Sequence, residues 1–353
     1  MSANYTGVIS TKEIVSPNKL TFGQRIVSGF ALFGALPPLL LIMIIVFALA
    51  NPIFLTPGNL ITLATQAVFL LLVSLGQMVV LITGGFDLSV GSNVALTSVV
   101  SATVMAAVYG GMEEFTGEAV WSGFFIVLAV GLIVGLVNGI GVAFLKVNAF
   151  IVTLASMSIF AGITLVFSGG SQISGLPRFF THEIGSGSLG GFPIPVLMTI
   201  PVIIIMLVVL RWTRFGRHLY AIGGNPNAAT VSGIRVRLNL MAAYVICGLL
   251  ASYAGWLLTA RVASGQPLLG GSFALESITA AIIGGAALTG GRGGVGGTLL
   301  GVIFVMGLTN GMNLMRMDSN QQSIAIGIVL VIAVVADRLR TRARAKTLAW
   351  KAK

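Results

Sequence analysis

Charged residues are scarce in this chain. Only 8% of the 353 residues are Asp, Glu, Lys or Arg, against about 25% in soluble globular domains. Hydrophobic residues make up 56% of the chain, and its mean hydropathy is +1.02. This composition excludes a soluble globular domain and indicates a polytopic membrane protein with most of its length in the bilayer.

Cysteine and histidine are also scarce, which excludes several kinds of site. The single cysteine, Cys247, permits no disulfide within the chain, and in its apolar run we expect an inert buried thiol. His182 and His218 are too far apart to suggest a metal site, and no clustered His/Asp/Glu set indicates a membrane enzyme. The chain lacks a Gly-x-x-x-x-Gly-Lys-Ser/Thr segment for binding a nucleotide. We therefore expect no metal and no cofactor on this chain.

Ten apolar segments are candidates for membrane spans, each of which takes about 20 residues in a helix. The eighth and tenth are short, so we expect them to be broken, less tilted or shielded by protein. The fold class predicted is an all-α polytopic membrane protein with about ten transmembrane helices. The expected spans are 30–50, 60–82, 90–108, 121–145, 149–167, 192–210, 238–260, 273–288, 295–314 and 321–336.

The distribution of basic residues fixes the orientation of these spans. If the N-terminus is inside and ten spans alternate, the outer loops hold only three of the 20 basic residues, Arg178, Arg261 and Arg316. Cytoplasmic loops carry such an excess of Lys and Arg, so both termini are predicted to be cytoplasmic. The net charge of +11 then needs no nucleic-acid partner. The basic residues placed inside are Lys12, Lys19, Arg25, Lys146, Arg211, Arg214, Arg217, Arg235, Arg237, Arg292, Arg338, Arg340, Arg342, Arg344, Lys346, Lys351 and Lys353.

This topology divides the chain into three parts. Residues 1–29 form a cytoplasmic tail without the apolar core of a signal peptide, so no cleaved leader is expected. Residues 30–337 form one transmembrane domain, and residues 338–353 form a basic cytoplasmic tail.

The cytoplasmic loop 211–237 is a polar, basic island between two apolar runs. Within it Asn225 suits a helix N-cap, Pro226 the first helical position and Gly233 the C-terminal cap. A short capped helix on the cytoplasmic face offers a soluble partner a surface to grip. The residues predicted to couple this chain to that partner are Asn225, Pro226, Ala228, Ala229, Val231, Ser232 and Gly233.

A motif in the fourth predicted span recurs in the ninth. Gly135-Leu-Val-Asn-Gly139 is followed 172 residues later by Gly307-Leu-Thr-Asn-Gly311. The two spans run in opposite directions in the predicted topology, which favours an inverted repeat of the kind common in transporters. Chance similarity in Gly-rich membrane sequence is the alternative. The glycines are expected to let helices pack closely.

The ionisable residues argue against an ion-coupled carrier. Such carriers place charged groups in mid-span, whereas Asp87 and Glu276 lie at predicted helix starts, where a carboxylate stabilises the helix dipole. We expect Asp87 to cap the helix that begins near Ser89, and a separate protein to supply the energy. The polar residues assigned to a translocation pathway or to helix packing are Gln77, Asp87, Asn93, Asn138 and Asn310.

Three motifs carry a resemblance to a known family. They are Thr83-Gly-Gly-Phe-Asp-Leu-Ser-Val-Gly-Ser92, the loop segment Phe215–Val236, and Ile283-Gly-Gly-Ala-Ala-Leu-Thr-Gly-Gly-Arg-Gly293. Together the chain resembles, over residues 60–337, the inner-membrane permease of a bacterial ATP-binding cassette importer of the ribose branch. Phe86 stands where that branch usually has Ile.

The resemblance implies a set of partners and a mechanism. The partners are a second permease chain, two cytoplasmic ATPase subunits or one tandem ATPase that bind ATP and Mg²⁺, and a periplasmic sugar-binding protein. The mechanism implied is alternating access in the bacterial inner membrane, with the coupling helix driven by the ATPase. For docking of the binding protein we select the outer arginines Arg178, Arg261 and Arg316, because arginine pairs with carboxylates at interfaces. The alternatives are a permease for branched-chain amino acids or nucleosides, and a carrier that works without a binding protein.

Overall fold

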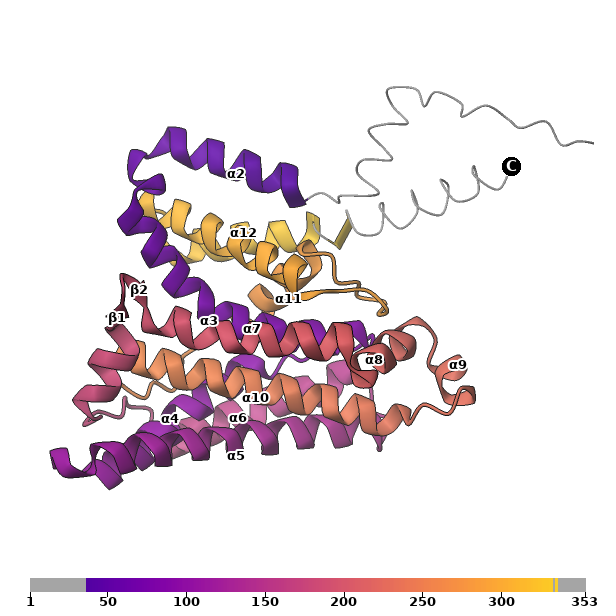
Figure 1. The fold of residues 1–353 in the computed structure, drawn as a ribbon, viewed down its shortest axis with the longest axis horizontal. Helices are drawn as coiled ribbons and strands as arrows, with labels where there is room; N and C mark the ends of the chain where they lie inside the picture. Colours follow the sequence, from indigo (N-terminus) through magenta and orange to yellow (C-terminus); the bar gives the residue numbers. More distant parts are fainter. Residues whose placement is uncertain (1–35, 333, 336–353) are drawn as a thin grey trace, which may run out of the picture.

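The computed structural model describes residues 36–332 and 334–335, and this part of the chain is almost entirely helical (Figure 1). Its only strands form the hairpin β1 (Ser188–Leu189) and β2 (Phe192–Pro193). The α-helices are α2 (Leu36–Ala50), α3 (Pro57–Ile82), α4 (Val90–Tyr109), α5 (Thr116–Ala143), α6 (Ala149–Ser168), α7 (Ile194–Trp212), α8 (Arg214–Gly224), α9 (Pro226–Val231), α10 (Val236–Val262), α11 (Phe273–Ile283) and α12 (Val295–Leu314). Shorter elements are the 3₁₀-helices η1 (Pro52–Leu55) and η2 (Glu113–Phe115) and the π-helix η3 (Phe179–Ile184).

The helices match the ten predicted spans in number and confirm the fold class. Seven described helices are long and apolar enough to cross a membrane, and three shorter apolar ones, α2, α11 and Ser319–Ile332, occupy the remaining positions. Residues 30–35 of the first span and both predicted tails lie outside the described residues. The eighth span differs most from its prediction, because α11 ends at Ile283, before a turn through Gly284 and Gly285.

The described charges separate toward the two ends of the bundle, in agreement with the predicted alternation. The end that carries α8 and α9, at the right in Figure 1, also holds the start of α10 and the loop between α11 and α12. Lys146, Arg211 and Arg292 belong to this inner end. The opposite end carries the β-hairpin, η2 and η3, with Arg178, Arg261 and most of the described acidic residues.

Glycine lets the central helices α5 and α10 touch through their backbones. A Cβ on Gly131 would stand 2.8 Å from the Gly248 carbonyl oxygen, and one on Gly135 would stand 2.7 Å from the Tyr244 carbonyl oxygen. Gly139 makes a similar approach to Met241. The expectation of close packing at these glycines is therefore confirmed.

A segment without helix returns into the bundle between α10 and α11. It starts at the outer end, where Gly265 pairs with Ile173, and the Gln266 N–H donates to the Ser98 hydroxyl at 3.1 Å. It continues along α4 until Gly270 packs against Gly91 near the start of that helix. The helix α11 therefore begins inside the bundle, which explains why the eighth span is short.

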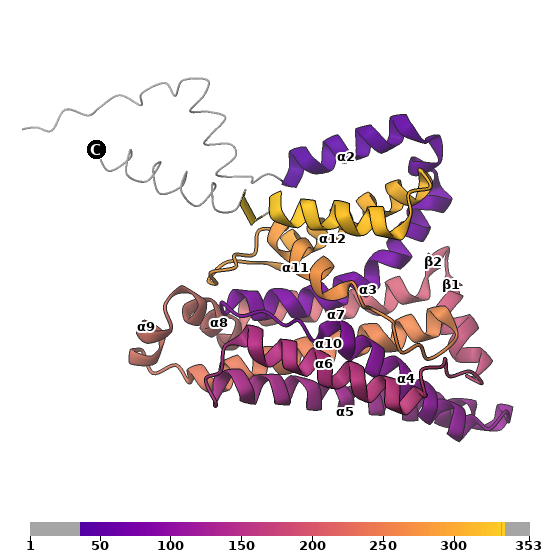
Figure 2. The same cartoon turned by 180° about the vertical axis from the view of Figure 1, so that it is seen from behind.

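The packing of the helices repeats in two sets of three. The helices α4, α5 and α10 contact one another, and so do α11, α12 and α3, and each set takes two helices from one half of the chain and one from the other. In this comparison α3 corresponds to α10, α4 to α11 and α5 to α12, and corresponding helices make corresponding contacts. The members of each pair run in opposite directions, as Figures 1 and 2 show. This arrangement supports an inverted repeat.

Candidate functional site

The inner end carries two helices in the loop 211–237, not the single one predicted. The helix α8 starts directly after α7, and its N-cap Thr213 accepts from the Gly216 N–H at 3.2 Å. Leu219 and Ile222 on one face are buried, whereas Arg217 on the other is exposed. This amphipathic spacing is the signal that sequence reasoning missed.

The helix α9 forms where the sequence predicts it. The Asn225 side chain accepts hydrogen bonds from the N–H groups of Asn227 and Ala228, both at 3.0 Å, so Asn225 is the N-cap. Gly233, with φ at +80°, follows the last turn. The Ile234 N–H bonds the Ala229 carbonyl and the Gly233 N–H bonds the Thr230 carbonyl, which is the Schellman arrangement for ending a helix.

The exposed surface of α9 includes most of the predicted coupling residues. Val231 is 91% exposed, an unusual position for a branched apolar side chain beside water. Ala229 is the exception, because it is only 4% exposed and packs against its own chain. It therefore does not belong to a docking face. The exposed members of the predicted set are Asn225, Pro226, Ala228, Val231, Ser232 and Gly233.

A glycine junction ties α8 to the ends of two membrane helices. The Gly291 N–H donates to the carbonyl of Ile82, the last residue of α3, at 2.8 Å. The Tyr220 hydroxyl of α8 donates to the Gly293 carbonyl, just before α12, at 2.9 Å. A Cβ on Gly223 would overlap the Ile82 carbonyl oxygen. We define Ile82, Gly223, Gly291 and Gly293 as the glycine junction.

Burial raises the pKa of the Tyr220 hydroxyl at this junction, and the positive charge of Arg211 opposes the rise only in part. The hydroxyl therefore stays protonated at neutral pH, as a donor to Gly293 requires.

Asp87, in the segment between α3 and α4, accepts several hydrogen bonds in a buried polar cluster. One carboxylate oxygen accepts from the Ser89 N–H at 2.8 Å and the Ser89 hydroxyl at 2.6 Å, and the other accepts from the Asn138 amide at 3.1 Å. The side-chain amide of Gln77, oriented with its nitrogen toward the carbonyl of Asp87, bonds both backbone groups of that residue. Its nitrogen donates to the Asp87 carbonyl at 3.0 Å, and its oxygen accepts from the Asp87 N–H at 3.1 Å.

The structure revises the role expected of Asp87. The N-cap of α4 is Ser89, and it makes no side-chain cap bond. Asp87 instead fixes the N–H and the hydroxyl of that N-cap residue and links the loop to α5 through Asn138. A carboxylate two residues before the N-cap accepts donors of the preceding turn, which is a local alternative to capping.

The other polar candidates join helices within the chain. Asn93 of α4 donates to the Gly248 carbonyl of α10 at 2.9 Å and accepts from Ser252 at 2.9 Å. Asn310 of α12 exchanges hydrogen bonds with Asn59 of α3 at 2.8 and 3.0 Å. Asn93, Asn138 and Asn310 thus bond to other elements of the chain, and Gln77 supports the backbone at Asp87.

The outer arginines lie apart from one another in the structure. Arg261 lies in the last turn of α10, where its guanidinium donates to the Ser186 hydroxyl at 3.1 Å. It lines a recess of about 260 Å³ with Thr62 and Thr65 of α3. Arg178 precedes η3 and is exposed, and Arg316 follows α12 in a left-handed conformation, with φ at +60°.

Comparison with known proteins decides the family. Residues 59–334 match the family described as the permease component of the branched-chain amino acid transport system. The chain belongs to this permease family. It is accordingly a multi-pass protein of the inner membrane and a transporter subunit, and ATP hydrolysis resides on separate ATPase subunits.

Several curated relatives of the permease are similar over most of their length. The Ribose import permease protein RbsC of Bacillus subtilis (strain 168) is 38% identical over 309 residues, which cover 86% of this chain and 91% of the relative. The protein of the same name from Escherichia coli (strain K12) is 37% identical, with 84% and 91% covered. The Galactose/methyl galactoside import permease protein MglC of that strain is 34% identical, with 87% and 94% covered. No solved structure matches the chain.

The Asp87 cluster predicts different outcomes for two substitutions. In Asp87→Asn the side-chain oxygen still accepts from Ser89. The new NH₂ group faces Asn138, whose side-chain oxygen has no partner and accepts from it once the Asn138 amide has rotated. In Asp87→Ala the N–H and hydroxyl of Ser89 lose their acceptor, and Asn138 keeps only its bond to the Ser89 hydroxyl oxygen at 2.7 Å, at about 1–3 kcal/mol for each unsatisfied group. We expect Asp87→Asn to insert and transport, and Asp87→Ala to lose most folded protein. Thermal unfolding of the purified variants and uptake assays measure this. Equal loss in both variants contradicts a packing role and indicates that the charge itself is needed.

Proposed function

We propose that this chain is the membrane-spanning subunit of an ATP-driven importer for a monosaccharide. The observation that carries the proposal is the similarity, over most of both chains, to permeases named for ribose and galactose import. A further relative, the D-allose transport system permease protein AlsC of Escherichia coli (strain K12), is 33% identical over 88% of this chain. The relatives named here differ in their sugar, so the proposal extends to the class and not to one member.

Coupling to the ATPase would run through α9 and α8. The exposed residues of α9 form a short surface at the inner end, and the adjoining α8 is amphipathic, with its apolar face buried. The glycine junction joins α8 to the end of α3 and to the loop before α12. A displacement of α9 by the ATPase therefore reaches two membrane helices through backbone contacts. This supports alternating access driven from the inner face.

The buried polar residues of the bundle agree with recognition of the sugar by a separate protein outside the membrane. Polar side chains such as Asn93, Asn138 and Asn310 are buried and bonded to neighbouring helices. A pathway that binds sugar weakly suffices where a periplasmic binding protein supplies the affinity. We therefore include a sugar-binding protein, a second permease chain and two ATPase subunits, or one tandem ATPase, among the partners. Residues 30–337 would form the single transport domain.

The family description itself favours a second candidate, a permease for branched-chain amino acids. Uptake separates the two. The full importer, assembled with its ATPase and binding protein in cells, should accumulate labelled ribose, allose or galactose, and vanadate should stop it by blocking ATP hydrolysis. Accumulation of leucine in their place would support the second candidate. Uptake that continues in vanadate would refute an ATP-driven importer.

The exposure of Val231 gives a test of the coupling surface. Val231→Glu adds a charge to an exposed apolar contact without touching the packing of α9, so the permease should insert normally. We expect copurification of the ATPase to weaken by at least about tenfold, because burying an unpaired charge at an interface costs more than about 1.4 kcal/mol. Leu189→Glu in the outer hairpin, at a position 70% exposed, is the matched control and should keep the ATPase. Normal association of Val231→Glu would remove α9 from the coupling surface.

The recess at Arg261 gives a test of binding-protein docking. We expect Arg261→Glu to reduce the stimulation of ATPase activity by the sugar-loaded binding protein, and more so at low salt, because screening weakens exposed charge pairs. Arg178→Glu and Arg316→Glu are the comparison variants. Full stimulation in all three variants would exclude the outer arginines from docking.

A further inference from the structure

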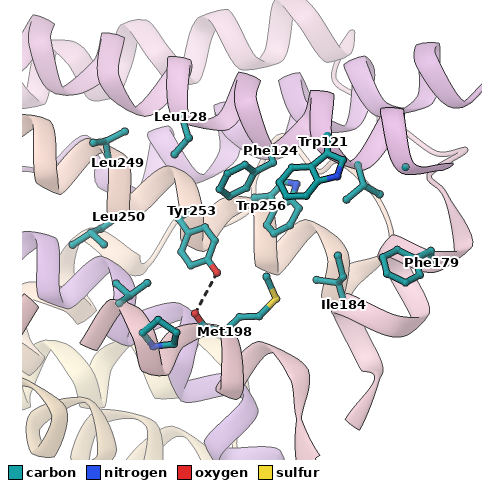
Figure 3. A pocket seen from close by; sticks show the side chains of 14 residues that line it. Trp121, Phe124, Leu128, Phe179, Ile184, Met198, Leu249, Leu250, Tyr253 and Trp256 are labelled. Atoms are coloured by element: carbon teal, nitrogen blue, oxygen red, sulfur yellow. Dashed lines mark hydrogen bonds between the residues drawn. The ribbon is translucent and has the colours of Figure 1, made fainter. Parts of the chain in front are cut away.

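A cavity of about 780 Å³ lies between the helices α5, α7 and α10, with η3 at its outer end (Figure 3). Its wall carries the aromatic side chains of Phe124, Tyr253 and Trp256, and among the described residues that line it none is charged. The Tyr253 hydroxyl donates to the Met198 carbonyl at 3.3 Å, whereas the indole N–H of Trp256 is buried without a hydrogen-bond partner. An apolar cavity of this kind does not hold water.

The cavity is elongated along the helices. On α5 its lining runs from Gly117, in the first turn at the outer end, to Leu128 near the middle of the helix. Eleven residues of α-helix rise about 16 Å. Half of a bilayer's hydrocarbon core is about 15 Å thick. Along α5 the cavity is therefore about as long as one leaflet is deep.

The cavity opens onto a surface that faces lipid. Trp121 and Phe125 of α5 are each 63% exposed, and Ile204 and Ile205 of α7 are 54% and 58% exposed. Both helices are long, apolar and buried over less than a third of their hydrophobic windows. Trp121, near the outer end, suits the aromatic belt at the membrane interface.

We propose that this cavity, called the slot from here on, binds one acyl chain of a phospholipid from the outer leaflet. The match of slot length to leaflet depth, the apolar lining and the opening toward lipid all select this occupant. The chain would lie between α7 on one side and α5 with α10 on the other, against the ring of Trp256. An acyl chain in the slot would hold α7 at a fixed distance from α5 and α10. Because α7 leads through Thr213 into α8, the chain would also hold the start of α8 in place.

Tryptophan fluorescence tests the proposal on the full chain in lipid vesicles. The chain has four tryptophans, and replacing Trp121, Trp212 and Trp350 by Phe leaves Trp256 alone. Trp256 is only 2% exposed and packs against Phe124, Phe180 and Tyr253, so lipid around the bundle does not touch it. A phosphatidylcholine brominated in the middle of one acyl chain should quench most of its emission, relative to the same lipid without bromine.

Two further variants distinguish the slot from general contact with lipid. Val202→Phe on α7 narrows the slot and should abolish most of the quenching, and Ile204→Phe, on the same helix but outside the slot, should leave it unchanged. Size-exclusion chromatography and circular dichroism confirm that each variant is folded. Unquenched Trp256, or equal quenching in Val202→Phe and its parent, overturns the proposal. Unquenched Trp256 together with a Phe125→Cys cross-link between copies assigns the slot to a second copy of this chain.

Discussion

The interior of a bilayer offers no water to the peptide groups of the chain, so each must find a partner within the protein. Regular helices meet this requirement by themselves. The two segments that interrupt the helices, 83–89 and 263–272, meet it through side chains and neighbouring backbone. Gln77 brackets the backbone of Asp87, and Ser98 accepts from the Gln266 N–H. Gln77 of α3 and Ser98 of α4 are therefore explained by the breaks in the helices that they support.

Close contact between helices is the second consequence of the same environment. Lipid is as apolar as a leucine side chain, so association in the membrane depends on packing and on hydrogen bonds between helices. Gly131 and Gly135 bring the backbone of α5 onto α10. At that distance Asn93 of α4 reaches the Gly248 carbonyl, and Asn138 of α5 reaches the carboxylate of Asp87. Small residues and amides thus both hold α4, α5 and α10 together.

The span pattern and the caps of α9 were predictable from sequence because they depend on local chemistry. Runs of apolar residues mark membrane helices, and Asn225 and Gly233 satisfy the ends of α9 from within a few residues. The Asp87 cluster was not predictable, because Asn138 lies 51 positions away from it. The helix α8 was hidden by its basic residues, which are typical of a solvated loop although Leu219 and Ile222 face the bundle. The burial of Ala229 likewise depends on packing against the rest of the chain, which a short segment does not reveal.

The absence of a side chain at Gly223 has a mechanical meaning. Where two surfaces meet through flexible side chains, rotamer changes absorb small displacements before the partner moves. At Gly223 the backbone of α8 lies directly against the Ile82 carbonyl, with no room for even a methyl group. Protein interiors at such density have low compressibility. The contact between α8 and α3 is therefore rigid. A shift of α8 toward α3 by a fraction of an ångström displaces the end of α3 by a similar amount.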